Sequence, residues 1–236
     1  MNQEAYAFIE KNEDFHWWFN ARQNIIKTFL NKERPFFENV LDVGCGTGFF
    51  LKNITEISKN RYGIDSHNYS TNNIKVIKGD ALNIPFEDNS MDLVTMLDVL
   101  EHIPEADKAL KELHRVVKKD GIGFITVPAI QMLYSPHDKN HGHVKRYYKK
   151  DLKDLLEENG FEIVRISYFN TILFPIEFAI RMIEKVLDKE FEKKENKDNI
   201  INKLLYYIFN LETYLLNSIN LPIGLSLAAI VKPIQK

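Results

Sequence analysis

The sequence predicts an α/β protein in which a mostly parallel sheet is covered by helices on both faces. Short apolar runs rich in Val, Ile and Leu alternate with helical patterns along most of the 236-residue chain. Continuous apolar runs of this kind are typical of strands that are buried on both faces of a sheet. A glycine-rich turn ends the first of these runs, and a helical pattern follows it.

Composition limits the classes of protein to consider. A share of 44% apolar residues is ample for a buried core, and a net charge of −2 argues against a nucleic-acid partner. The single cysteine excludes an intrachain disulfide and any zinc site built from several cysteines. The first residues lack the pattern of a signal peptide, and no apolar stretch has the length of a transmembrane span. We therefore expect a soluble, cytoplasmic protein.

The chain divides into three parts. Residues 1–38 predict an aromatic-rich helical cap, which Pro35 closes. Residues 39–170 plus 222–236 carry the alternating pattern of the core, and residues 171–221 form a helical insert before the last strand. The core strands are expected at 39–45, 61–65, 75–80, 91–98, 121–128, 161–169 and 224–232. The core helices are expected at 49–58, 105–119 and 150–158, the last of them ending at Gly160.

The insert combines a charged and an apolar segment. Glu177, Arg181, Glu184 and Asp188 recur at helical spacing in its first part, residues 189–199 are mostly charged, and an almost uncharged segment follows. The apolar surface of this insert is larger than a pair of helices usually buries. A lid over an acceptor site is the first interpretation, a homodimer interface the second and a peripheral membrane contact the third.

The stretch from Leu41 to Phe49 holds the most informative motif. Gly44, Gly46 and Gly48 follow Asp42 where a buried strand enters a helix, so the backbone can turn tightly and present unpaired N–H groups to a ligand. A carboxylate, a ribose and a phosphate are all candidate ligands, and a tight turn without a ligand is the alternative. A dinucleotide fingerprint needs a third glycine where this chain has Phe49.

This D-x-G-x-G-x-G arrangement resembles motif I of class I S-adenosylmethionine-dependent methyltransferases. Asp65 ends the second strand and Asp80-Ala81 ends the third. The run GDALNIPFEDNSMDLVTMLDVLEHIPE is similar to the methyltransferase type 11 subgroup, and the likeness covers roughly residues 36–170 and the final strand. The resemblance implies a Rossmann-like sheet with the strand order 3-2-1-4-5-7-6 and an antiparallel strand 7. It also implies S-adenosylmethionine as cofactor, with S-adenosylhomocysteine as product.

The resemblance places the cofactor at the carboxyl ends of strands 1 and 4. The glycines would shape the methionine end, Asp65 would hold the ribose, and Cys45 is expected to pack beneath the loop rather than act as a nucleophile. The stretch 66–73 leaves little room for the family's usual helix. The residues expected around the cofactor are Asp42, Gly44, Cys45, Gly46, Gly48, Asp65, Ser66, Asp80, Ala81, Leu82, Leu97, Asp98, His102 and Arg22.

The loop after the fifth strand gathers three histidines. His137 or His143 could act as a general base, or the loop could be structural, with its polar side chains bonded to the backbone. A metal site using His137, His141 and His143, with Asp138, is the third alternative. We predict no metal, because methyl transfer rarely requires one. Arg146 could clamp an anionic acceptor or pair with Asp138.

The acceptor site is expected between the cap and this loop. Its candidate residues are Trp17, Trp18, Tyr134, Arg146 and Tyr147, although the two tryptophans could instead pack on the core. We expect an enzyme that moves a methyl group by in-line displacement to a small-molecule or lipid-like acceptor, with oxygen or nitrogen favoured over carbon. The alternatives are a non-catalytic cofactor-binding or assembly protein and a nicotinamide-dependent oxidoreductase.

Overall fold

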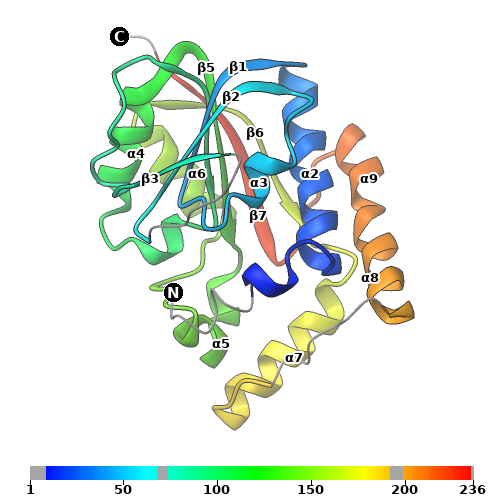
Figure 1. The fold of residues 1–236 in the computed structure, drawn as a ribbon. Helices are drawn as coiled ribbons and strands as arrows, with labels where there is room; N and C mark the ends of the chain where they lie inside the picture. Colours follow the sequence, from blue (N-terminus) through cyan, green and yellow to red (C-terminus); the bar gives the residue numbers. More distant parts are fainter. Residues whose placement is uncertain (1–8, 68–73, 192–198, 235–236) are drawn as a thin grey trace.

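A twisted sheet lies between two layers of helices in the computed structural model, which describes residues 9–67, 74–191 and 199–234 (Figure 1). Within these residues the sheet has seven strands in the order β3-β2-β1-β4-β5-β7-β6. Strands β1 to β5 pair in parallel, and β7 is antiparallel to both β5 and β6. The predicted fold class, strand order and antiparallel strand are confirmed. The strands are β1 (Phe37–Val43), β2 (Ser58–Asp65), β3 (Lys75–Lys78), β4 (Met91–Leu97), β5 (Val117–Pro128), β6 (Phe161–Phe169) and β7 (Ser226–Pro233).

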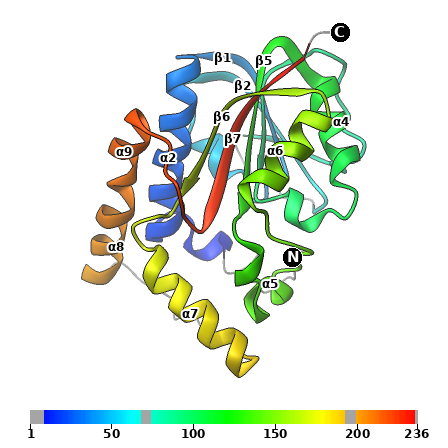
Figure 2. The ribbon, with the colours of Figure 1, turned by 180° about the vertical axis from the view of Figure 1, so that it is seen from behind.

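The helices form three groups around the sheet. Helices α4 and α6 cover one face and α2, α8 and α9 the other, while α5 and α7 lie beyond one end of the strands (Figures 1 and 2). The α-helices are α2 (Trp17–Glu33), α3 (Phe49–Lys52), α4 (Ala106–Val116), α5 (Pro136–Asn140), α6 (Lys149–Glu158), α7 (Phe174–Leu187), α8 (Ile200–Asn210) and α9 (Glu212–Ser218). Two 3-10 helices are η1 (Leu100–His102) and η2 (Gln131–Leu133).

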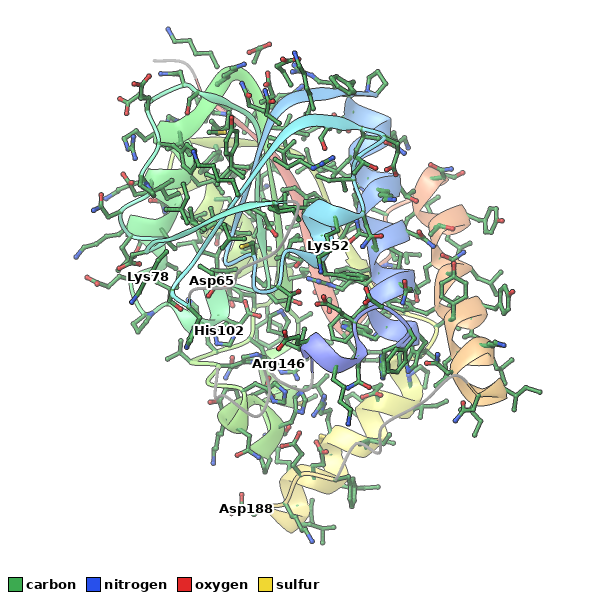
Figure 3. All side chains as sticks on the ribbon, in the orientation of Figure 1. Lys52, Asp65, Lys78, His102, Arg146 and Asp188 are labelled. Atoms are coloured by element: carbon green, nitrogen blue, oxygen red, sulfur yellow. The ribbon has the colours of Figure 1, made fainter. Side chains whose placement is uncertain are left out.

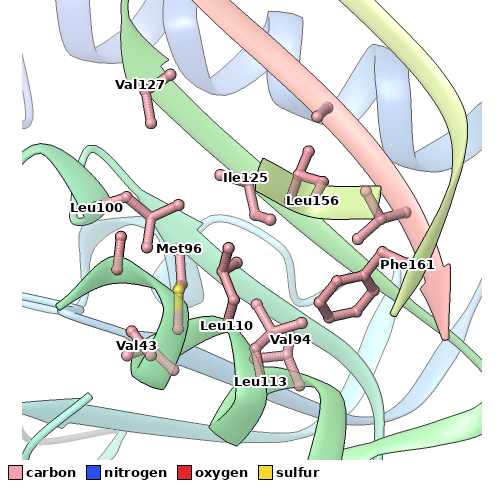
Figure 4. Close-up of a cluster of buried hydrophobic side chains, with 14 of the residues drawn as sticks. Val43, Val94, Met96, Leu100, Leu110, Leu113, Ile125, Val127, Leu156 and Phe161 are labelled. Atoms are coloured by element: carbon pink, nitrogen blue, oxygen red, sulfur yellow. The ribbon is translucent and has the colours of Figure 1, made fainter. Parts of the chain in front are cut away.

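Apolar side chains fill both faces of the sheet. On one face Val94 and Met96 of β4 meet Leu110 and Leu113 of α4 (Figure 4). On the other face Phe29 of α2 and its neighbours form a second cluster, which reaches into α8 and α9. The central strands are therefore buried on both sides, which explains their continuous apolar sequences.

Two predicted helices are longer than the observed ones. The expected helix 49–58 is wrong beyond Lys52, because β2 begins at Ser58, which is paired with Phe37 at the start of β1. The expected helix 105–119 ends at Val116, because Val117 already pairs with Met91 in the sheet.

Glu212 fastens the insert to the core. The side chain is fully buried, and its carboxylate accepts hydrogen bonds from the backbone N–H groups of Asn170 (2.7 Å), Thr171 (2.6 Å) and Ile172 (2.8 Å). A carboxylate that accepts several N–H groups compensates for its own burial. The one charged residue of the apolar segment thus fixes the start of α9 against the end of β6.

Helix α7 directs its charged stripe toward the protein. Arg181 and Glu184 are buried and joined by a 3.0 Å ion pair, whereas Val186 is 80% exposed and Leu187 59%. None of the helices in the part of the chain that the structure describes is long and apolar enough to cross a membrane. Parts of the expected cap, of the stretch 66–73 and of the charged segment 189–199 lie outside the described residues.

Candidate functional site

An open cleft of about 1500 Å³ lies at the carboxyl ends of the parallel strands. This position is where open α/β sheets bind their ligands. The cleft is larger than the 300–1,000 Å³ that is usual for one small-molecule site, so it has room for a cofactor and a second molecule. Asp65, His102 and Arg146 lie at this end of the sheet, and Asp188 marks the distant end of α7 (Figure 3).

The turn after β1 depends on its glycines. Gly44, Gly46 and Gly48 have φ values of +74°, +52° and +78°. A Cβ atom on Gly44 would lie 2.6 Å from Cγ2 of Val99, so a side chain cannot be accommodated there without a shift. A Cβ on Gly46 would meet nothing within 4 Å, and Gly46 lines the cleft. The loop therefore brings bare backbone to the cleft.

Asp65 supports this loop from the neighbouring strand. The side chain is buried at the end of β2, and its two oxygens accept 2.9 Å hydrogen bonds from the backbone N–H groups of Gly46 and His67. Each carboxylate oxygen keeps a further lone pair that can accept another donor. Ser66 also lines the cleft beside Asp65. Asp65 therefore has room to accept a hydrogen bond from a ribose hydroxyl, and the contact with the ribose stays a prediction.

Asp42 is a buried carboxyl group below the loop. Its Oδ1 accepts a 2.6 Å hydrogen bond from the hydroxyl of Thr95 on β4. Burial raises the pKa of Asp42 to about 7, and nearby Asp65 adds to the rise, while the Thr95 bond and the charge of Arg22 oppose it. The carboxyl group therefore changes its charge close to neutral pH.

Arg22 links the N-terminal cap to the ends of β4 and β5. Its Nη2 lies 2.8 Å from Oδ2 of Asp98 and donates a 2.8 Å hydrogen bond to Oγ1 of Thr126. Asp98 has a φ of +58°, an uncommon conformation for a residue other than glycine, and the Thr126 hydroxyl donates to its second oxygen. Arg22 and Asp98 both line the cleft, so the pair forms part of its wall.

The remaining cofactor candidates divide into two groups. Asp80 and Ala81, expected beside the adenine, and Leu97, expected on the sulfonium side, all line the cleft. Leu82 packs against the core and is not among the described residues that line the cleft. The Cys45 side chain is buried beneath the loop, where its Sγ lies against Gly63, and burial raises the pKa of the thiol. Packing, as expected, describes Cys45 better than nucleophilic chemistry.

Asp138 organises the loop after β5. The fully buried carboxylate accepts hydrogen bonds from His143 Nδ1 (2.8 Å), Arg146 Nε (2.9 Å) and the Ser135 backbone N–H (3.0 Å). Burial alone would raise the pKa of Asp138, but His143 and Arg146 hold it well below its ordinary value. Of the two alternatives for Arg146, pairing with Asp138 is the one observed, and Arg146 also lines the cleft.

The three histidines do not converge on one point. His137 Nδ1 lies 2.6 Å from a carboxylate oxygen of Glu190, which follows α7, and the rings of His137 and His141 are 4.0 Å apart. His143 instead lies beside His102, with ring centres 4.8 Å apart. Burial and, after it, the charge of nearby His143 lower the pKa of His102 to about 4, so this ring is neutral at physiological pH.

The acceptor candidates are placed differently. Tyr147 is buried in the core, where its hydroxyl donates to the Leu100 carbonyl, and burial raises its pKa. Tyr134 donates to the carbonyl of His143. Neither tyrosine is among the described residues that line the cleft, so the expected contact of both with an acceptor is corrected. Trp17 and Trp18 border the cleft and also pack on Phe209 of α8, at centroid distances of 5.8 Å and 5.1 Å.

Two buried carboxyl groups in the cleft wall were not expected from the sequence. Glu13 accepts hydrogen bonds from the hydroxyl of Thr47 and from Lys52. These bonds join the N-terminal cap to the glycine loop. Glu101 is fully buried, and both of its oxygens lack a hydrogen-bond partner within the described residues. The triplet Leu100-Glu101-His102 was the sequence signal that could have identified Glu101, but only its histidine is among the predicted site residues.

Comparisons with known proteins agree with this geometry. The methyltransferase domain family matches residues 41–125. A demethylmenaquinone methyltransferase of Staphylococcus aureus (strain JH9) is 30% identical, over 55% of this chain and 70% of that protein. Two solved structures have similar folds. One is a methyltransferase in complex with the Haloferax volcanii Trm112 methyltransferase activator, with a TM-score of 0.63, 16% identity and coverage of 99% of this chain and 96% of that one. The other is a SAM-dependent methyltransferase from Archaeoglobus fulgidus, with a TM-score of 0.56, 22% identity and coverage of 89% and 94%.

The pKa of Asp42 predicts a measurable pH dependence of stability. The native carboxyl group holds its proton up to about pH 7, whereas the unfolded one releases it near pH 4. This group therefore lowers the free energy of unfolding as pH rises from about 4 to 7, by at most about 1.4 kcal/mol per pH unit. Asp42→Asn should lose less stability than the wild type between pH 5 and pH 7 in urea unfolding. The exposed control Asp151→Asn should follow the wild type, and an unchanged slope in Asp42→Asn would contradict the assignment.

Proposed function

Because the chain belongs to the class I S-adenosylmethionine-dependent methyltransferases of the type 11 kind, we propose that it binds S-adenosylmethionine in this cleft and methylates a small-molecule or lipid-like acceptor. The observation that carries the proposal is the loop from Gly44 to Gly48, where left-handed glycines bring bare backbone to the cleft above Asp65. The Asp65 carboxylate fits the cofactor, because ribose hydroxyls need an acceptor. Within Gly44–Gly48, the N–H of Thr47 is the one backbone donor without a partner among the described residues, so it can serve the amino-acid end of the cofactor.

The chain's own residues would mainly bind, orient and exclude water. The bound cofactor supplies a methyl group already activated by a sulfonium centre. We assign the methionine end to the glycine loop, the ribose to Asp65 and the adenine side to Asp80 and Ala81. The Arg22–Asp98 pair would close the wall next to the sulfonium, and Trp17 and Trp18 would exclude water from the acceptor side.

An oxygen or nitrogen acceptor must also lose a proton. His143 is a candidate base, because its Nδ1 donates to Asp138 and its Nε2 then has the free lone pair. His137 already contacts Glu190 through Nδ1. The name of the Staphylococcus aureus relative supports a small organic acceptor for this chain, and demethylmenaquinone itself is one candidate.

The insert contributes to this proposal in two ways. Glu177 and Arg181 of α7 line the cleft, which supports the lid interpretation for the first part of the insert. The second part, α8 and α9, carries exposed apolar residues in steps of four and three. They are Ile200, Leu204, Tyr207, Leu211 and Tyr214, with exposed fractions of 84%, 58%, 67%, 53% and 72%.

This 3.5-residue period is the pattern of a helix that packs against another helix. Ile201 and Leu215 next to this stripe are exposed as well (58% and 42%), and an apolar helix face of this kind fits a partner helix. We therefore propose that α8 and α9 pair with the same helices of a second copy, so that the enzyme is a homodimer.

Gly46→Ala provides a direct test of cofactor binding. The added methyl group would enter open space in the cleft, so it should weaken S-adenosylmethionine binding at least tenfold in isothermal titration, with only about 1 kcal/mol lost from backbone strain. Gly160→Ala is the matched control, because Gly160 also has a positive φ (+83°) but follows α6 and does not line the cleft.

Wild-type protein that bound neither S-adenosylmethionine nor S-adenosylhomocysteine would refute the proposal. Binding of a nicotinamide cofactor instead would favour an oxidoreductase. Transfer of a labelled methyl group to components of a cell extract separates an enzyme from a non-catalytic binding protein, because only the enzyme turns over.

The proposed dimer is tested by a paired substitution on the stripe. In sedimentation velocity the wild type should have the mass of two chains, and Leu204→Glu with Leu211→Glu should dissociate it, because buried charges in such a seam are unfavourable. Phe36→Glu with Ile234→Glu changes two similarly exposed residues elsewhere and should leave the dimer intact. A monomeric wild type would contradict the dimer, and its flotation with lipid vesicles would favour the membrane contact.

A further inference from the structure

One carboxyl group that borders the cleft lacks hydrogen-bond partners. Glu101 is fully buried and borders the cleft, yet neither carboxylate oxygen has a hydrogen-bond partner within the described part of the chain. A buried carboxyl group without a hydrogen-bond partner is unfavourable in either protonation state. Native proteins avoid such a cost unless a ligand satisfies the group, so Glu101 indicates a missing partner.

Two imidazoles stand beside this carboxylate. Glu101, His102 and His143 each offer one ligand atom, and the three atoms lie within 4.8 Å of one another. His102 and Glu101 are neighbours in η1, whereas His143 comes from the loop after β5. Bonds of about 2.0–2.2 Å to a Zn²⁺ ion would draw the three atoms somewhat closer together.

The hydrogen bonds behind both rings orient them as metal ligands. The Nδ1 atom of His102 donates to the Gly142 carbonyl at 3.1 Å, and Nδ1 of His143 donates to Asp138 at 2.8 Å. These bonds fix the tautomer in which Nε2 has the free lone pair. Ligating histidines almost always donate their other nitrogen to a carbonyl or a carboxylate in this way.

The other histidine cluster differs in its carboxylate, which is already satisfied. His137, His141 and Glu190 also lie within ligand distance of one another, but Glu190 already contacts His137 Nδ1 with one oxygen (2.6 Å) and accepts from Asn140 with the other (2.7 Å). That cluster is a hydrogen-bonded link between α7 and the histidine loop. It therefore serves as an internal comparison for the first cluster.

We propose that Glu101, His102 and His143 bind a divalent first-row transition-metal cation such as Zn²⁺. Two imidazoles and one carboxylate form a donor set that suits zinc, iron or manganese, and three protein ligands leave coordination positions open. The open positions face the cleft, where an oxygen of the acceptor would bind. The cation site rests on this geometry alone, and only its use on an acceptor rests on the proposed function.

The site would change how the acceptor is activated. A bound cation lowers the pKa of a hydroxyl group that coordinates it, so the oxygen loses its proton to solvent before it attacks the methyl carbon. His143 would then act as a ligand rather than as a free base. This use favours an oxygen acceptor over a nitrogen acceptor. It also differs from the expectation from the sequence that the protein holds no metal.

Equilibrium dialysis against ZnCl₂ with elemental analysis tests the site. The wild-type chain should bind one Zn²⁺ per chain at this cluster. Glu101→Gln and His143→Gln should each bind it at least tenfold more weakly, since each removes one of three ligands. His141→Gln should retain the wild-type affinity. Circular dichroism checks that each variant is folded, and His102→Gln replaces any variant that is not.

Thermal melting supplies a second readout. Zn²⁺ should raise the melting temperature of the wild type and of His141→Gln, but not that of Glu101→Gln. Absence of stoichiometric binding, undiminished binding by Glu101→Gln, or loss of binding in His141→Gln alone would overturn the proposal. A chain that binds Zn²⁺ but not S-adenosylmethionine would keep the metal site and refute the methyltransferase activity, and the reverse result would do the opposite.

Discussion

The path of the chain after β1 is the constraint on which the cleft depends. Gly44 can turn there only with a positive φ and without a Cβ atom, because Val99 occupies the place that a side chain would need. The turn brings the N–H of Gly46 to Asp65, so the first and second strands are locked together at their carboxyl ends. A loop held in this way presents its backbone to the cleft in a fixed position, which favours ligand binding without reorganisation.

Segments far from this turn in the sequence complete the cleft. Arg22 of α2 joins Asp98 and Thr126 at the ends of β4 and β5, and Glu13 contacts Thr47 of the glycine loop. On the opposite side, the loop after β5 is held by the buried Asp138. The charged groups of these walls are mostly paired with one another, and the unsatisfied carboxyl group of Glu101 adjoins two oriented histidines.

Much of the fold could be predicted because each strand carries its own apolar signal and the motif order fixes the topology. Side-chain environment was harder to predict. Helical spacing identified the charged stripe of α7 but not the direction it faces, since that depends on the partners of Arg181 and Glu184. No local pattern separates the buried Glu13 from exposed neighbouring carboxylates, and Tyr147 belongs to the core although its polar surroundings suggested a site.

A crystal structure with S-adenosylhomocysteine tests the central claim most directly. The account predicts that the amino-acid end of the ligand lies against the backbone of the glycine loop and that its ribose hydroxyls lie within hydrogen-bond distance of Asp65. A ligand bound elsewhere, or a cleft that stays empty at saturating concentration, would contradict the account.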